Sequence, residues 1–338
     1  MQELRREITV TRWELTSSQT LFAGFVAACA LGAAAIGSFP LEASIVTIFL
    51  FAGIHNFMEF RYFVARMPVR WGRSRTFYTV GIGGVLVLTA GYLTLYFASG
   101  NWLWSETGWA AFSAVWNTAL IVWVGWLFHL RGRQRPGTDW SWAFPAAFLL
   151  AAAAWIVPLY WSLALVYLHP FIAMWFLDRQ IRRSRPQWLR AYRACLMSVP
   201  VFVAIIWIAL WDRPALSEET NLFWRIAQHA GSGILPGISS HVLVATHVFL
   251  ESIHYFVWIL LIPLVDRRAI PWRLGDIPLA ANRSGYPRLV AGALVVSLSL
   301  VFVFWAGFGL DYAATRDIYF AFAIAHVMAE FPFLIKML

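Results

Sequence analysis

Three histidines in apolar stretches of the chain are each followed, four residues later, by a glutamate. The pairs are His55 with Glu59, His247 with Glu251, and His326 with Glu330. Residues four apart lie on the same face of a helix, so each pair presents an imidazole and a carboxylate side by side. The composition predicts roughly 0.2 such pairs by chance. Because ionisable groups inside a membrane are costly, this excess indicates a functional site.

The richest stretch runs from His241 to Val265 and is long and apolar enough to cross a bilayer. Besides His247 and Glu251 it carries His254, three residues after Glu251. This is the Glu-x-x-His spacing with which helical bundles hold two iron ions. Imidazole with carboxylate and no thiolate suits iron, zinc or manganese. The stretch therefore predicts part of a metal site on one helix face.

The composition requires these groups to sit in a membrane protein. Of 338 residues, 60% are hydrophobic and only 13% are charged, and there are 20 tryptophans, which are typical of interfacial belts. Repeated apolar runs of about 20 residues predict an all-α, polytopic transmembrane helix bundle of about ten spans, forming a single integral-membrane domain over 1–338. The predicted spans are 21–39, 43–66, 77–98, 108–130, 142–157, 159–178, 191–211, 241–265, 287–308 and 317–336.

The charged loops predict the orientation of the chain. Arginine-rich segments follow the second, fourth, sixth and eighth spans, whereas acidic or weakly charged loops, such as 98–108, follow the first, third, seventh and ninth. By the positive-inside rule both termini face the cytoplasm, as in a multi-pass protein of the cell (inner) membrane. The net charge of +9 is thus explained by topology, and nucleic acid is not an expected partner.

The remaining connections add two expectations. The long segment from Asp212 to Ser240 contains an amphipathic pattern over 221–230, which predicts a short interfacial helix followed by a turn, with an ordinary loop as the alternative. Cys29 and Cys195 lie in or beside apolar spans, so a disulfide framework is not expected.

Every histidine within a predicted span lies in an even-numbered span, and these spans run in one direction. We therefore expect the rings to converge on one site. His55, His254 and His326 would be nitrogen ligands, and Glu59, Glu251 and Glu330 would be terminal or bridging carboxylates; His129, His169 and His247 would complete or orient the shell. Packing roles are the alternative for His129 and His169, and an ion pair with Arg61 is the alternative for Glu59. His229 and His241, at the outer end, are interpreted as structural.

Non-haem iron, as one or two ions, explains the partnered glutamates best, since carboxylates stabilise a highly charged iron; zinc and manganese are less favoured. Haem would account for the histidines but not for the glutamates. Two other classes stay open: a proton- or cation-coupled transporter that uses the His/Glu groups as a relay, and a b-type haem electron carrier.

The segments GIHNFMEFRYF, THVFLESIHYF and AIAHVMAEFPF belong to a histidine-rich, multi-span chain that resembles the integral-membrane iron oxygenases. In size and character it is most similar to the Brp/Blh-type bacterial β-carotene dioxygenase family. The resemblance lies in the general plan and carries over no catalytic residue. It implies an oxidoreductase, a dioxygenase acting on a lipophilic small-molecule substrate such as a carotenoid, isoprenoid, quinone or acyl lipid, with membrane lipids and an electron donor as partners. The HxxxH and HxxHH boxes of membrane desaturases are absent from the sequence.

Overall fold

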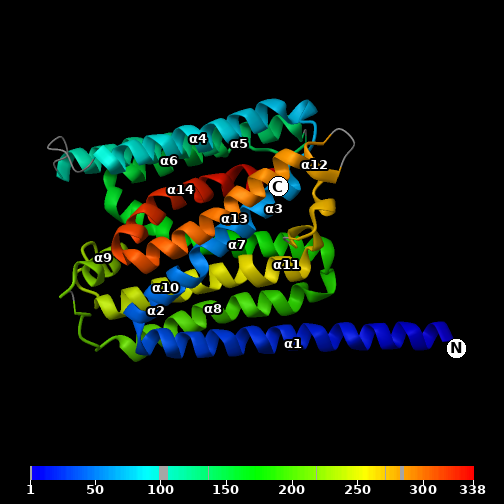
Figure 1. The fold of residues 1–338 in the computed structure, drawn as a ribbon, viewed down its shortest axis with the longest axis horizontal. Coiled ribbons are helices and arrows are strands. Elements are labelled where there is room, and N and C mark those ends of the chain that lie inside the picture. Colours follow the sequence, from blue (N-terminus) through cyan, green and yellow to red (C-terminus); the bar gives the residue numbers. More distant parts are fainter. Residues whose placement is uncertain (1, 99–105, 136, 218, 271, 282–284) are drawn as a thin grey trace. The chain divides into compact units, whose positions relative to one another are not determined.

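The computed structural model describes residues 2–98, 106–135, 137–217, 219–270, 272–281 and 285–338. The described residues are 86% helical and form no strand (Figure 1). Among them, nine helices are long and apolar enough to cross a membrane. The predicted all-α, polytopic class is therefore confirmed, while the orientation in the membrane stays a prediction.

The helices that could span the membrane fall close to the predicted positions. They are Gln19–Ser38, Pro40–Arg66, Gly72–Thr94, Ala110–Gln134, Pro158–Ser184, Pro186–Leu210, Ser240–Val265, Pro287–Leu310 and Tyr312–Met337. The predicted span 142–157 corresponds to α6 (Ala143–Ile156), whose 14 residues are fewer than the roughly 20 that a bilayer requires. Most of the predicted acidic loop 98–108 lies outside the described residues.

The chain forms two compact units. Unit 1 comprises Met1–His55 and Pro170–Ile270, and unit 2 comprises Asn56–His169 and Pro271–Leu338. Two of the boundaries fall inside helices, namely α3 (Gly53–Arg66) and α7 (Pro158–Ser184). In α7 the boundary coincides with Pro170, which has no N–H for the helical hydrogen-bond ladder.

Unit 1 is built around α10 (Ser240–Phe256), which packs against α1 (Gln2–Ser38), α2 (Pro40–Thr47) and α8 (Leu189–Leu210) (Figure 1). The span that contains α10 is 67% buried, against 17–50% for the other candidate spans. Other helices therefore surround most of α10, and the polar side chains that it carries lie in or near the interior of unit 1.

Two π-helical turns interrupt the predicted second and eighth spans. One is η1 (Ile48–Ala52), just before α3, and the other is η4 (Val257–Leu261), between α10 and α11 (Ile262–Val265). Pro263 explains η4, because it cannot donate to the carbonyl four residues earlier and the ladder shifts. The sequence of η1 contains no proline, and nothing in it explains the turn.

The helix predicted over 221–230 is present as α9 (Asn221–His229) in unit 1, while its interfacial position stays a prediction. Its N-cap is Thr220, whose Oγ1 accepts a hydrogen bond from the backbone N–H of Phe223 at 3.1 Å. Gly231, with φ of 99°, follows the helix and lets the chain turn. Nearby, Nε2 of His241 lies 3.0 Å from the carbonyl oxygen of Gly37, which fits the structural role predicted for His241.

Unit 2 contains α4 (Arg75–Ala98), which packs against α5 (Glu106–Gln134) and α14 (Tyr312–Met337) (Figure 1). The helix α6 lies along α5, and α13 (Pro287–Leu310) lies along α14. Indole N–H groups link α5 to α4 within the core: Trp123 donates to the carbonyl of Val80 at 2.9 Å, and Trp116 to that of Leu88 at 3.0 Å.

The remaining short helical segments of the described chain are η2 (Gly72–Ser74), η3 (Pro186–Trp188), η5 (Arg267–Ala269), η6 (Leu274–Asp276) and α12 (Pro278–Ala281).

Gly84 is required for the close approach of α4 and α5. A Cβ at position 84 would overlap the indole of Trp123, which its hydrogen bond holds in place, whereas a Cβ at Gly83 would have no neighbour within 4 Å. We expect Gly84→Ala to destabilise the protein by roughly 1–3 kcal/mol through overpacking. Gly83→Ala should not lower stability. Thermal unfolding of both variants in the same detergent measures this, and equal melting temperatures would contradict it.

Candidate metal centre

Four of the predicted ligands lie together in unit 2. They are Glu59 on α3, His169 on α7, and His326 and Glu330 on α14. Nδ1 of His169 lies 3.2 Å from Oε2 of Glu330, and the ring centroids of His169 and His326 are 5.3 Å apart. Glu59 and His326 offer ligand atoms within 4.8 Å of one another. Two imidazoles and two carboxylates from three helices therefore meet, although they are far apart in the sequence.

The carboxylates of this cluster are removed from solvent. Glu59 and Glu330 are both 0% exposed, and the two groups are near enough to interact electrostatically. Within the described chain, neither carboxylate oxygen of Glu59 has a hydrogen-bond partner. A buried carboxylate without a partner is strongly unfavourable, and a second one nearby increases the cost. A cation bound among the four side chains would offset it.

Contacts between α3 and α14 fix the position of Glu59. Tyr62 donates its hydroxyl to Sδ of Met337 at 3.7 Å, and Phe63 stacks on Phe333 with centroids 4.4 Å apart. Phe63 is one turn beyond Glu59 on the same face of α3, so this packing turns Glu59 toward α14. The predicted alternative paired Glu59 with Arg61, which is two residues along and faces elsewhere. The guanidinium of Arg61 donates to the carbonyl of Arg273 at 3.0 Å.

A second pair of imidazoles lies in unit 1. The rings of His55 and His254 are in edge contact, with centroids 5.3 Å apart, and both residues are 1% exposed. Their nearest nitrogen atoms lie within 4.8 Å of one another. The ring of Tyr255 stacks on His55 at 4.2 Å and restricts its orientation. Unit 1 therefore provides two buried nitrogen donors beside the two π-helical turns.

The pair His247 and Glu251 belongs to another array in unit 1. Nδ1 of His247 lies 3.9 Å from Oε2 of Glu251, and Oε1 of Glu251 accepts a hydrogen bond from the hydroxyl of Tyr255 at 2.6 Å. On the other side, the ring of His229 lies 5.0 Å from that of His247. Polar groups thus continue from α9 along one face of α10 to Tyr255. Sequence reasoning missed Tyr255, although it extends the i, i+4 series by one step.

The ring of His129 lies among aromatic rings of unit 2. Its ring centroid is 5.3 Å from that of Trp126 and 5.6 Å from that of Phe144. These contacts fit the packing role that was the alternative for His129. The structure therefore brings the predicted ligands together as four in unit 2, as an imidazole pair in unit 1, and as the His247–Glu251 pair. The expectation that all nine share one site stays a prediction.

Comparisons of the chain with protein families, with curated proteins and with solved structures found no match. The resemblance to membrane iron oxygenases consequently rests on the plan of the sequence alone.

Proposed function

We propose that the protein is a membrane-embedded, non-haem iron oxidoreductase with one or two metal ions, acting as an oxygenase on a lipophilic substrate. The observation that carries the proposal is the buried cluster of unit 2, in which Glu59 has no hydrogen-bond partner among the described residues and lies beside a second carboxylate and an imidazole. Such a donor set favours a divalent or trivalent cation, and an empty cluster of this kind would be costly in a membrane.

Iron suits this cluster better than haem does. Glu59 and Glu330 would neutralise the charge of the ion, while His169 and His326 would supply nitrogen donors and fix its position. Bound iron would supply oxygen activation. The residues of the chain hold the ion and keep water away from it, which prevents side reactions. A carotenoid, isoprenoid, quinone or acyl lipid would be available to such a site from the surrounding bilayer.

The decisive measurement is metal analysis of the full-length protein purified in detergent without added metal. Stoichiometric iron without a Soret absorption band would support the proposal, and Mössbauer or electron paramagnetic resonance spectra would report whether one or two ions are bound. A protein with no stoichiometric metal would contradict it. A Soret band would instead indicate the haem electron carrier, and bound zinc or manganese would remove the iron assignment.

A second candidate function is proton transfer, which the array in unit 1 favours. From His229 the chain of groups passes through His247 and Glu251 to Tyr255, and the ring of Tyr255 lies on His55. Imidazole, carboxylate and phenol groups in sequence can pass protons into a membrane interior. Such a path serves a transporter, and it also serves an enzyme that consumes protons.

Glu251→Gln tests the proton path. Glutamine keeps the size of the side chain but cannot carry the proton onward, so proton flux into proteoliposomes should fall to the level of protein-free liposomes. A pH-sensitive dye measures the flux. Glu219→Gln, which alters an exposed glutamate, serves as the control and should leave the flux unchanged. Flux that persists in Glu251→Gln, or that is absent from the wild type, would exclude the relay.

A further inference from the structure

A pocket opens in unit 1 where the second half of α7 meets the first turns of α8. Its volume is about 440 Å³, within the range of about 300–1,000 Å³ that is typical of small-molecule sites. Its polar lining consists of Asp178, Arg179, Arg182 and Arg193. Its apolar lining includes Phe171, Trp175 and Leu196. A ligand that fills it must therefore combine a charged part with an apolar part.

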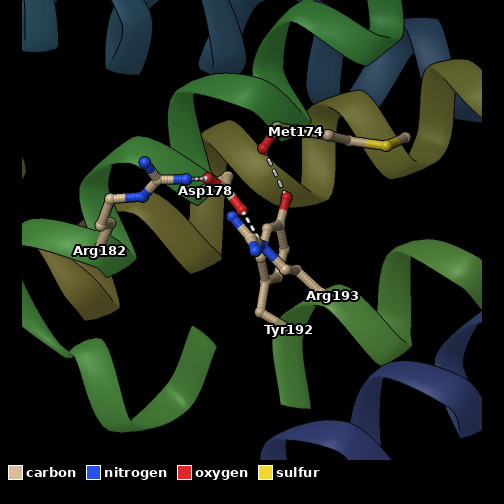
Figure 2. Close-up of polar contacts among 5 residues, drawn as sticks. All are labelled: Met174, Asp178, Arg182, Tyr192 and Arg193. Carbon is tan, nitrogen blue, oxygen red and sulfur yellow. Dashed lines mark hydrogen bonds and ion pairs between the residues drawn. The ribbon is translucent and has the colours of Figure 1, made fainter. Parts of the chain in front are cut away.

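Asp178 holds two of the arginines in place, as Figure 2 shows. Its Oδ1 accepts a hydrogen bond from Nε of Arg193 at 3.0 Å, and its Oδ2 accepts one from Nη2 of Arg182 at 3.4 Å. Asp178 is 15% exposed, whereas Arg182 and Arg193 are 49% and 51% exposed. One shielded carboxylate thus orients two accessible guanidinium groups that come from different helices.

The pocket keeps an excess of positive charge after this pairing. The two guanidinium groups of Arg182 and Arg193 share the single carboxylate of Asp178, which leaves one positive charge. Each bond to Asp178 uses one of the five N–H donors of a guanidinium. The remaining N–H donors have the planar, forked geometry that binds two oxygens of a phosphate group at once. The guanidinium of Arg179 lies 4.7 Å from the ring centre of Trp175, in a cation–π contact that restricts its orientation.

The position of the pocket favours a lipid over a soluble anion. The two candidate spans end at Ser184 and begin at Pro186, so Arg182 and Arg193 lie in the end portions of these spans, where we expect lipid head groups. Phe171, which is 44% exposed, and Leu196 continue the lining toward the apolar part of the helices. An acyl chain can lie there while a phosphate contacts the arginines. Basic pockets between membrane helices recognise anionic lipid head groups in this way.

We propose that this pocket binds an anionic phospholipid, with its phosphate between Arg182 and Arg193 and its acyl chain against Phe171 and Leu196. Asp178 is the positioning residue of the site. The bound lipid would join α7 to α8 at this end of unit 1, in addition to the hydrogen bond from the hydroxyl of Tyr192 to the carbonyl of Met174 at 2.6 Å (Figure 2).

Native mass spectrometry of the full-length protein with phosphatidylglycerol or phosphatidylcholine tests the proposal. The wild type should retain phosphatidylglycerol in preference to phosphatidylcholine. The double variant Arg182→Gln/Arg193→Gln should lose affinity for phosphatidylglycerol by roughly 5-fold per arginine, about 25-fold in all, with little change toward phosphatidylcholine. Leu196→Glu, which places a carboxylate in the pocket and keeps both arginines, should also weaken the binding.

Arg183→Gln/Arg190→Gln removes the same charge from exposed positions outside the pocket and should keep the preference. A wild type that binds both lipids equally would overturn the proposal, whether or not the variants fold. Equal losses in the two double variants would do so as well, because the effect would then be one of overall charge. If inorganic phosphate competed as effectively as phosphatidylglycerol, the ligand of the pocket would be a soluble phosphate and the lipid proposal would be wrong.

Discussion

Replacing Glu330 by glutamine is expected to remove most of the metal from the purified protein. Glu330 lies at the centre of the unit 2 cluster, 3.2 Å from His169 and one helical turn from His326, and is 0% exposed. Glutamine keeps the shape of the side chain but lacks the charge that a cation requires. Loss of even an outer partner of a metal ligand lowers affinity by roughly 10- to 100-fold, so we expect Glu330→Gln to lose at least this much.

The series around Glu330 separates a metal ligand from a residue that only supports the fold. Glu59→Gln and His326→Ala should lower the metal content in the same way as Glu330→Gln. His129→Ala is the matched control, because His129 is also a histidine of unit 2 but lies among aromatic rings. It should keep the metal of the wild type. Inductively coupled plasma mass spectrometry on monodisperse protein gives the metal-to-protein ratio.

The series shows whether the unit 2 cluster binds the metal and whether other histidines also contribute. If Glu330→Gln remains folded and keeps its full metal content, the unit 2 cluster is not the metal site. His254→Ala tests the separate, sequence-based expectation that the rings of all even-numbered spans serve one centre. A reduced metal content in His254→Ala would support that expectation, whereas an unchanged content would restrict the centre to the residues of unit 2.

The sequence predicted the spans and the candidate ligands because both depend on local patterns. Apolar runs with arginine-rich ends predict membrane helices, and the spacing of His326 and Glu330 predicts a shared face on α14 once that helix exists. The length of α6 was harder to predict. Its apolar run continues into the next helix without a charged loop, and the break at Val157 and Pro158 depends on local backbone geometry.

The partners of each ligand could not be predicted from the sequence. Whether His169 contacts Glu330 depends on how α7 packs in unit 2, and a single chain does not reveal helix neighbours. His129 and His169 both follow an apolar run in the sequence, yet His129 packs beside Trp126 and Phe144 whereas His169 contacts Glu330. The π-helical turn η1 near His55 could not be predicted either, since its sequence holds no proline, whereas Pro263 just after η4 accounts for the turn near His254.

Metal removal is expected to destabilise the wild type but not the variant Glu59→Gln. A ligand at 100 times its dissociation constant stabilises the folded state by about 2.7 kcal/mol. Chelation removes this contribution and leaves Glu59 and Glu330 buried without the cation that would offset the cost of burying them. The melting temperature of the wild type should therefore fall by several degrees on chelation.

The order of stability of the wild type and Glu59→Gln is expected to differ between the metal-bound and the metal-free proteins. The variant has only one buried carboxylate in this cluster. Its metal-free form should therefore melt at a higher temperature than the metal-free wild type, and its free energy of unfolding should be larger by roughly 1–3 kcal/mol. With metal present, the wild type should be the more stable of the two, because the variant binds the ion weakly. Scanning fluorimetry with and without a chelator, on both proteins in one detergent, measures all four melting temperatures.

This reversal distinguishes a metal site from an ordinary buried polar cluster. If Glu59 only contributed to packing, Glu59→Gln would shift the melting temperature by the same amount with and without the chelator. A proton relay without metal would also give equal shifts, since chelation would then change neither protein. Only a cation that offsets the charges of Glu59 and Glu330 makes the carboxylate favourable in one condition and unfavourable in the other, so an unreversed order would exclude the proposed centre.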